Sequence, residues 1–233
     1  MATAEEQLEA AVGELPKAFG PDRPSSVGGR AHCYTSDELA ILAGPRNEIP
    51  VDLISQVARE VPDHWDDFAG LYRRLTPRIL PPLVTGDLPV DEALVGERLH
   101  EAVLAQWPAA ERAAVDRNCQ AWWRATLEQH PRQPTAMQAL EFLVAYSGDV
   151  QPWLDGWTAA ARPAASKHLA DLCDHAVNYI DGNNRICLGF NQLRDVTAPG
   201  ASDTLELLVG TLTDGNSTTK GRQAPGLRLR PDR

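Results

Sequence analysis

The chain has 233 residues, an apolar fraction of 43% and a net charge of −10. A chain of this length buries enough apolar surface to fold without disulfides or a metal ion, and the composition is that of a globular protein. The acidity disfavours binding of nucleic acid by the body of the protein, because nonspecific binding needs a basic face that displaces counterions.

Three further features bear on the compartment. No apolar run approaches the ~20 residues that span a bilayer, so we expect no membrane insertion. The amino-terminal sequence MATAEEQLEA lacks the basic and apolar regions of a secretory signal. The cysteines are widely spaced and form no CxxC pair, which predicts reduced thiols: Cys33, Cys119, Cys173 and Cys187. Together these features predict a cytoplasmic protein.

The first predicted element is an amphipathic helix within residues 1–19. Its apolar residues form one stripe at helical spacing: Leu8, Ala11, Val12, Leu15 and Phe19. Residues 20–30 are rich in glycine, proline and serine, which predicts a linker. We therefore expect a helix that docks either on the body of the protein or on a partner.

Residues 31–182 are predicted to form an all-α core domain of six to eight helices. Thr35 and Glu38 have the spacing of a capping box, and Asp63 is expected to cap a helix that Pro77 kinks or ends. The strongest helical pattern covers residues 108–129. Short loops marked by proline favour an antiparallel helical bundle or a short stack of helical hairpins.

Further along, Thr135 is expected to cap a helix that Gly148 closes, and Pro163 to begin another. Six tryptophans lie between residues 65 and 157. All of them except Trp123 fall on apolar helix faces or at helix junctions, which indicates a helical core over about residues 35–180.

Residues 183–233 are predicted to be an irregular, largely flexible tail. Strand signals occur only at residues 185–190 and 205–209, and glycine, serine, threonine and aspartate dominate after Pro199. From Lys220 to Arg233 there are five basic residues and one acidic residue, a net charge of +4, which leaves −14 on the rest of the chain. A basic tail of this kind is either solvated, folded back on the acidic body or bound to an anionic partner.

The best candidate metal site is formed by His168, Asp171 and His175. On a helix these three residues fall within about 60° of each other and flank the apolar stripe. Two imidazoles and a carboxylate are ligands for a divalent transition metal, and His64 or His100 are candidates to join them. The alternative is that the three residues form the solvated face of an amphipathic helix.

Two other polar clusters have simple structural interpretations. His64 with Asp66 and Asp67 could form a metal or acid–base site, but acids at a helix start also complement the helix dipole and pair with Arg73 or Arg74. Glu97 and His100 have the Glu-x-x-His spacing of di-iron bundles. The sequence has no second copy of that motif, so a solvated helix face is favoured.

A candidate interaction surface is formed by Trp123, Arg124, Arg73 and Arg74. Adjacent residues do not share a helix face, so Trp123 is expected to point away from the core if Trp122 points into it. Tryptophan and arginine are enriched where proteins bind each other. The alternative is that neighbouring helices bury both tryptophans.

No cofactor is predicted. The sequence has no glycine-rich phosphate loop, dinucleotide fingerprint, HExxH zinc motif or nucleophile elbow, and no cysteine and histidine lie at a useful spacing. These absences disfavour nucleotide-dependent and hydrolytic chemistry and leave open whether the protein is an enzyme.

One resemblance covers roughly residues 30–180. The motifs that carry it are His32-Cys33-Tyr34-Thr35, Asp66-Asp67-Phe68, Pro77-Arg78-Ile79-Leu80, Trp107-Pro108 and Ala121-Trp122-Trp123. In these the chain resembles a family of uncharacterised bacterial, actinobacterial-type all-α proteins. The resemblance implies an all-α fold and no established activity, and the last 50 residues depart from it.

The leading functional hypothesis is a noncatalytic protein-interaction module that binds another protein or a second copy of itself. It is motivated by the helical organisation, the tryptophans, the acidic body and the missing catalytic motifs. A metal-dependent helical-bundle enzyme that uses histidine and aspartate ligands is one alternative. An acidic immunity or antitoxin protein that neutralises a basic partner is the other.

Overall fold

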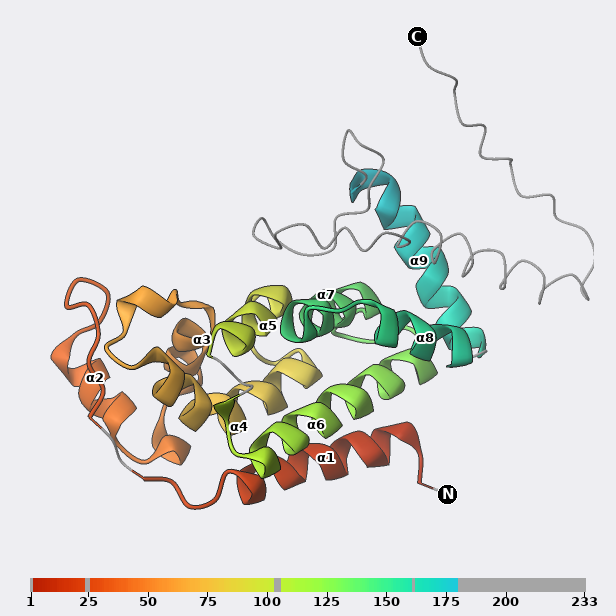
Figure 1. Cartoon of the computed structure of the whole chain (residues 1–233). Coiled ribbons are helices and arrows are strands. Elements are labelled where there is room, and N and C mark those ends of the chain that lie inside the picture. The colour runs from red at the N-terminus through yellow and green to blue at the C-terminus, as the bar shows by residue number, and fades with distance from the viewer. Residues whose placement is uncertain (1, 24–25, 103–105, 161, 180–233) are drawn as a thin grey trace, which may run out of the picture.

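The computed structural model describes residues 2–23, 26–102, 106–160 and 162–179, with side chains as far as Leu172. Within these ranges the chain is all-α, as predicted, and has no strands (Figure 1). The α-helices are α1 Ala4–Ala18, α2 Ser36–Ala43, α3 Val51–Arg59, α4 Phe68–Thr85, α5 Glu92–Glu101, α6 Ala109–Glu128, α7 Ala136–Ser147, α8 Gln151–Ala160 and α9 Pro163–Tyr179. Two 3-10 turns, η1 Arg46–Glu48 and η2 Pro62–His64, lie between them. The expected tail, residues 183–233, lies outside the described residues.

Local sequence signals set several helix ends. The side chains of Thr3, Thr35 and Thr135 each accept a hydrogen bond from the backbone amide three residues on. In return, the backbone amide of each threonine donates to the side chain of that residue, which completes a capping box. At the other end, Gly86 and Gly148 have φ of 77° and 71°, the left-handed conformation that glycine adopts without strain. The capping box predicted at Thr35 and the helix cap predicted at Thr135 are therefore confirmed.

Helix α4 departs from the prediction at both positions that the sequence singled out. It is capped by Asp67, whose Oδ1 accepts a hydrogen bond of 2.9 Å from the Gly70 amide, rather than by Asp63. It also continues through Pro77, which was expected to kink or end it. Leu75, Ile79 and Leu80 are fully buried around that proline. Burial of this apolar face holds the helix together although Pro77 donates no backbone hydrogen bond.

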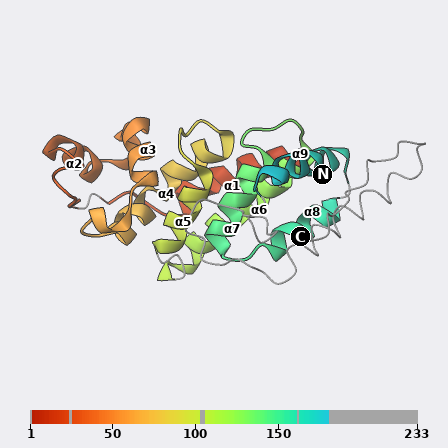
Figure 2. The ribbon, with the colours of Figure 1, turned by 90° about the horizontal axis from the view of Figure 1, so that it is seen from above.

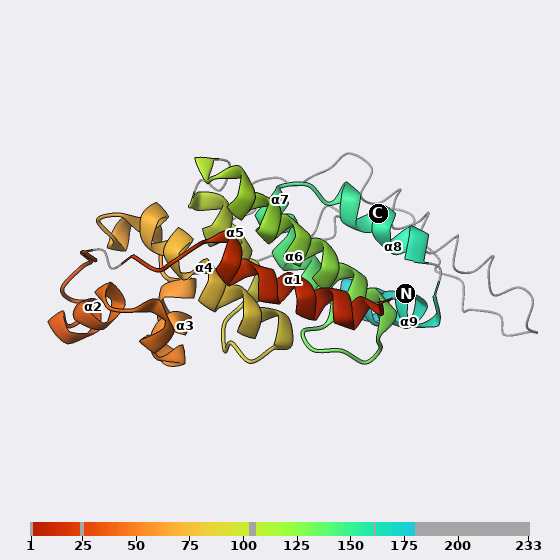
Figure 3. The ribbon, with the colours of Figure 1, turned by 90° about the horizontal axis from the view of Figure 1, so that it is seen from below.

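The amino-terminal helix packs on the body of the protein. Figures 1 and 3 show α1 lying along α6. The two helices are antiparallel, because Glu5 near the start of α1 pairs with Arg132 after the end of α6, whereas the Phe19 ring contacts the Trp107 ring near its start. Leu8 and Leu15 of α1 are buried. The sequence left open whether this helix docks on the body of the protein or on a partner. The structure shows it docked on the body.

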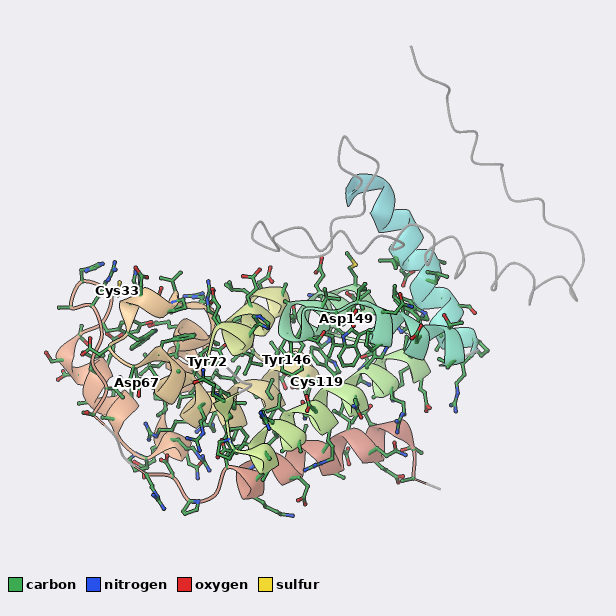
Figure 4. All side chains as sticks on the ribbon, viewed as in Figure 1. Cys33, Asp67, Tyr72, Cys119, Tyr146 and Asp149 are labelled. Carbon is green, nitrogen blue, oxygen red and sulfur yellow. The ribbon has the colours of Figure 1, made fainter. Side chains whose placement is uncertain are left out.

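Helices α5, α6 and α7 form the centre of the molecule. α6 and α7 are antiparallel neighbours, with Asp116 bonded to Tyr146 and Trp122 packed on Phe142. α5 instead runs parallel to α7, because Glu92 pairs with Gln138 at their starts and the His100 ring contacts the Tyr146 carbonyl at their ends. Figures 2 and 4 show these helices side by side, with the labelled Tyr146 and Cys119 between them. The core therefore combines antiparallel and parallel pairs.

The predicted linker is fastened to the core. The Asp22 carboxylate accepts two hydrogen bonds from the Arg74 guanidinium, at 2.8 and 3.0 Å, and one from the Arg46 amide, at 2.6 Å. Further along the same segment, the backbone of Gly28 accepts a hydrogen bond of 3.0 Å from the Asp66 amide. The described part of residues 20–30 is thus a packed connection between α1 and α2.

The Asp22 contacts predict that stability depends on pH. The hydrogen bonds from Arg74 hold the pKa of the Asp22 carboxyl below its ordinary value of 3.8 in spite of its partial burial. Because the folded-state pKa is the lower one, this contribution is complete above pH 3.8 and is lost as pH falls through the folded-state pKa. We expect acid titration followed by circular dichroism to show a smaller acid-induced loss of stability in Asp22→Asn than in the parent protein. Equal losses would contradict this assignment.

The tryptophans lie in the core, as expected for five of the six. Trp65, Trp107, Trp122 and Trp157 are buried and Trp153 is partly buried. Trp123, which was expected to point outward, is only 4% exposed. None of the described helices combines the length and the apolar character that crossing a bilayer requires.

Candidate functional site

Two of the three predicted metal ligands lie together on α9. Pro163 begins this helix, and His168 and Asp171 follow one turn apart. His168 is buried, with 4% of its surface exposed, and the Asp171 side chain is 61% exposed. The helix therefore places one predicted ligand under the surface and the next one on it. His175 lies on the same helix, but its side chain is outside the described residues.

The structure adds His130 to this pair. His130 follows Gln129, the residue that ends α6, and its ring centre lies 4.7 Å from that of His168. Its Nε2 lies 2.8 Å from Asp171 Oδ2. One ligand atom from each of His130, His168 and Asp171 lies within 4.8 Å of the others. These residues form the candidate metal centre.

The buried His168 side chain is oriented by a further contact. His168 Nε2 lies 2.6 Å from the Gln129 carbonyl oxygen, which only accepts, so Nε2 donates this hydrogen bond and Nδ1 is the nitrogen left for a metal ion. A hydrogen bond from the other ring nitrogen to a backbone carbonyl is the usual arrangement for a histidine that binds a metal. The same bond also satisfies a free carbonyl at the end of α6, so it has a structural role without any metal.

A cavity opens beside the candidate metal centre. It has a volume of about 540 Å³ and lies between the end of α6 and the start of α9. His130 is part of its wall, together with Lys167 and Arg162. Glu128 also lines the cavity, so a small molecule that entered it would meet two positive charges and one negative charge beside His130.

The other histidines named in the sequence do not join this centre. The Nδ1 atom of His100 contacts the Tyr146 carbonyl at 3.2 Å. His64 lies near η2 and contacts Glu60 at 2.9 Å. Figures 1 and 2 show that α2, α3 and the turn that follows them lie at one end of the molecule and that α9 lies at the other.

Trp123 does not present an exposed ring to a partner. Its Nε1 donates a hydrogen bond of 2.9 Å to the Trp153 carbonyl, and its ring packs edge-on against Trp157 at 5.3 Å. Of the two alternatives for Trp123, the outward orientation is wrong and burial of both tryptophans by neighbouring helices is confirmed, because α8 covers the second face of α6. Trp123 nevertheless forms part of the wall of a cavity of about 670 Å³ between α6 and α8, which Arg124 and Trp153 also line.

The remaining predicted interaction residues make contacts within the protein. Arg73 forms a two-pronged ion pair with the buried Glu111, at 2.5 and 2.6 Å. Arg74 binds Asp22, as described above, and Arg124 donates to the Gln7 side chain. These internal partners compete with any outside partner for the guanidinium groups of Arg73 and Arg74.

The sequence analysis missed a second cluster. Cys33, Glu60 and His64 also bring ligand atoms within 4.8 Å of one another. Cys33 lies 31 positions before His64, so no short motif contains both residues. The available signal was the pair of local motifs His32-Cys33 and Glu60-x-x-x-His64, which only the fold brings together.

No protein family, curated protein or solved structure matches this chain.

Proposed function

We propose that the protein is a metal-dependent helical-bundle enzyme, which binds a divalent transition-metal ion through His130, His168 and Asp171. The observation that supports this proposal is the convergence of the three side chains, which come from the end of α6 and from α9. Two imidazoles and one carboxylate form a ligand set of the kind found in catalytic zinc sites, where water or substrate takes the fourth position. A metal ion bound in this way activates water or polarises a substrate oxygen.

The cavity beside His130 suggests the class of substrate. Lys167 and Arg162 give its wall two positive charges, although Arg162 also pairs with Glu128 at 3.1 Å. An anionic small molecule is the substrate class that these charges favour. We also propose a cytoplasmic location, because Cys33 and Cys119 are free and thiols stay reduced in the cytoplasm.

Metal analysis of protein purified without a histidine tag tests the proposal. We expect the His168→Gln variant to bind one Zn²⁺ fewer than the parent protein in equilibrium dialysis, because it lacks the buried ligand. His100→Gln is the matched control, since His100 lies on α5 and contacts only a backbone carbonyl here. A folded His168→Gln variant that binds as much Zn²⁺ as the parent protein would reject this centre.

A protein-interaction module is the second candidate function. The cavity of about 670 Å³ between α6 and α8 is the feature that favours it, because Trp153 and Arg124 line it. Against it, Ile41 and Val51 are the only large apolar side chains that are exposed among the described residues. Partner interfaces usually bury a larger apolar patch. A monomer in sedimentation analysis and an empty pull-down would remove this candidate.

The immunity or antitoxin alternative depends on charge alone. The −14 carried by the chain before its basic tail would attract a basic partner. It stays a prediction, and capture of a basic toxin by the purified protein would support it.

A further inference from the structure

We propose that Cys33, Glu60 and His64 form a separate metal site, which binds a divalent thiol-seeking ion such as Zn²⁺ and fastens the segment before α2 to the turn before α4. This site goes beyond the proposed function, because it lies at the opposite end of the molecule and shares no residue with the centre at His130. Figure 4 shows the labelled Cys33 in the loop beside α2.

The three donor atoms converge on one point. His64 Nδ1 lies 2.9 Å from Glu60 Oε1 and 3.5 Å from Cys33 Sγ. All three residues are half-buried, so the site is shielded from bulk water on one side and still reachable by an ion. One thiolate and one carboxylate would together neutralise a divalent cation, which keeps the electrostatic cost of partial burial low.

The carboxylate is held in place by its neighbours. Glu60 Oε2 accepts a hydrogen bond of 3.2 Å from the Tyr34 hydroxyl, and Glu60 Oε1 accepts one of 3.0 Å from the Val61 amide. Tyr34 is itself buried and packs on the Trp65 ring at 4.4 Å. Support of this kind orients metal ligands and tunes their affinity.

The backbone also brings the two segments together. The Arg30 amide donates to the His64 carbonyl at 2.9 Å, and Gly29 forms an antiparallel bridge with Trp65. A Cβ at Gly28 would lie 1.9 Å from the Asp66 carboxylate, and one at Gly29 would lie 3.1 Å from the Trp65 ring. Glycine at these positions allows the close approach that places Cys33 against His64.

The geometry favours a metal site over a cysteine nucleophile. In a Cys–His–acid catalytic arrangement the thiol and the acid contact opposite nitrogens of the imidazole. Here Cys33 and Glu60 both approach the same nitrogen, Nδ1. The acid near Nε2 is Asp63, which lies 3.9 Å away, is 68% exposed and pairs with Arg30. A metal ion requires donors that surround one point, and these three side chains provide them. Water or the neighbouring His32 is available for the fourth position.

Titration of the reduced, tag-free full-length protein with Co²⁺ tests this site. A cobalt ion bound to a thiolate gives a charge-transfer absorption band in the near ultraviolet, whereas a site made of histidine and aspartate gives none. We expect this band to saturate at one equivalent of Co²⁺ in His168→Gln, which lacks the other proposed metal centre. It should disappear in Cys33→Ser and in His64→Gln, and Tyr34→Phe should weaken Co²⁺ binding by about 10–100-fold.

The controls separate this site from the proposed function. His168→Gln removes the other centre and should leave the charge-transfer band intact, while the double variant Cys173→Ser/Cys187→Ser excludes the thiols of Cys173 and Cys187. Absence of the band from the folded parent protein would overturn the proposal, and so would a band that survives Cys33→Ser. Rapid alkylation of Cys33 at the same rate with and without Zn²⁺ would also reject the metal site and favour a cysteine nucleophile.

Discussion

Replacement of Arg74 by alanine is expected to lower the free energy of unfolding by about 3–5 kcal/mol, the range found when a buried ion pair loses one partner. The Arg74 side chain is 9% exposed and binds the Asp22 carboxylate, which is 17% exposed. It also donates to the backbone carbonyls of Leu42 and Gly44. The alanine variant leaves a partly buried carboxylate and two carbonyls without these donors. Denaturation by urea measures the loss.

Two variants sharpen this test. Arg74→Lys restores the charge but not the planar fork, so its stability should fall between those of the parent protein and the alanine variant. Arg124→Ala is the surface control, because Arg124 is exposed and donates to the exposed Gln7 side chain, and its effect should stay within about 0.5 kcal/mol. Equal losses for Arg74→Ala and Arg124→Ala would mean that Arg74 does not hold the segment between α1 and α2.

Replacement of Gly96 by alanine is expected to lower the free energy of unfolding by about 1–3 kcal/mol, the usual cost of overpacking a close contact. Gly96 lies in α5 where this helix approaches α7. A Cβ at this position would lie 2.4 Å from the Phe142 carbonyl oxygen and 3.0 Å from the Ala145 Cβ. The first of these atoms belongs to backbone, so the two helices would have to move apart. Thermal and urea denaturation measure the effect.

Gly13 provides the matched control for Gly96. It also lies inside a helix, α1, but a Cβ there has no atom within 4 Å. Gly13→Ala should therefore raise stability by about 0.5–1 kcal/mol, because alanine loses less conformational freedom than glycine in a helix. The two glycine-to-alanine variants are expected to change stability in opposite directions. A neutral or stabilising Gly96→Ala variant would contradict the close approach of α5 and α7.

The local signals of the sequence were sufficient for much of the fold. The threonines that cap α2 and α7 satisfy backbone amides within three residues, so a short stretch of sequence determines these helix starts. The spacing of apolar residues predicted the buried faces of α1 and α6, since each face must lie against something apolar. Neither signal depends on distant parts of the chain.

The predictions that were wrong concern contacts between distant segments. Pro77 was expected to kink or end a helix, but α4 does not end there, and neighbouring elements bury the helix around it. Trp123 was expected to point outward, but α8 covers it, and the periodicity of α6 alone contains no information about α8. In both cases tertiary burial outweighed a local preference.

The candidate metal ligands were likewise predictable only where they are neighbours along one helix. One turn of α9 places His168 beside Asp171, so the sequence determined that pair, together with the all-α class and most helix ends. Only the tertiary structure decided that His130 joins them, and that Cys33 meets His64 at the other end of the molecule. The reason is physical: helical periodicity determines neighbours within about one turn, whereas neighbours from separate elements depend on which apolar faces pack together.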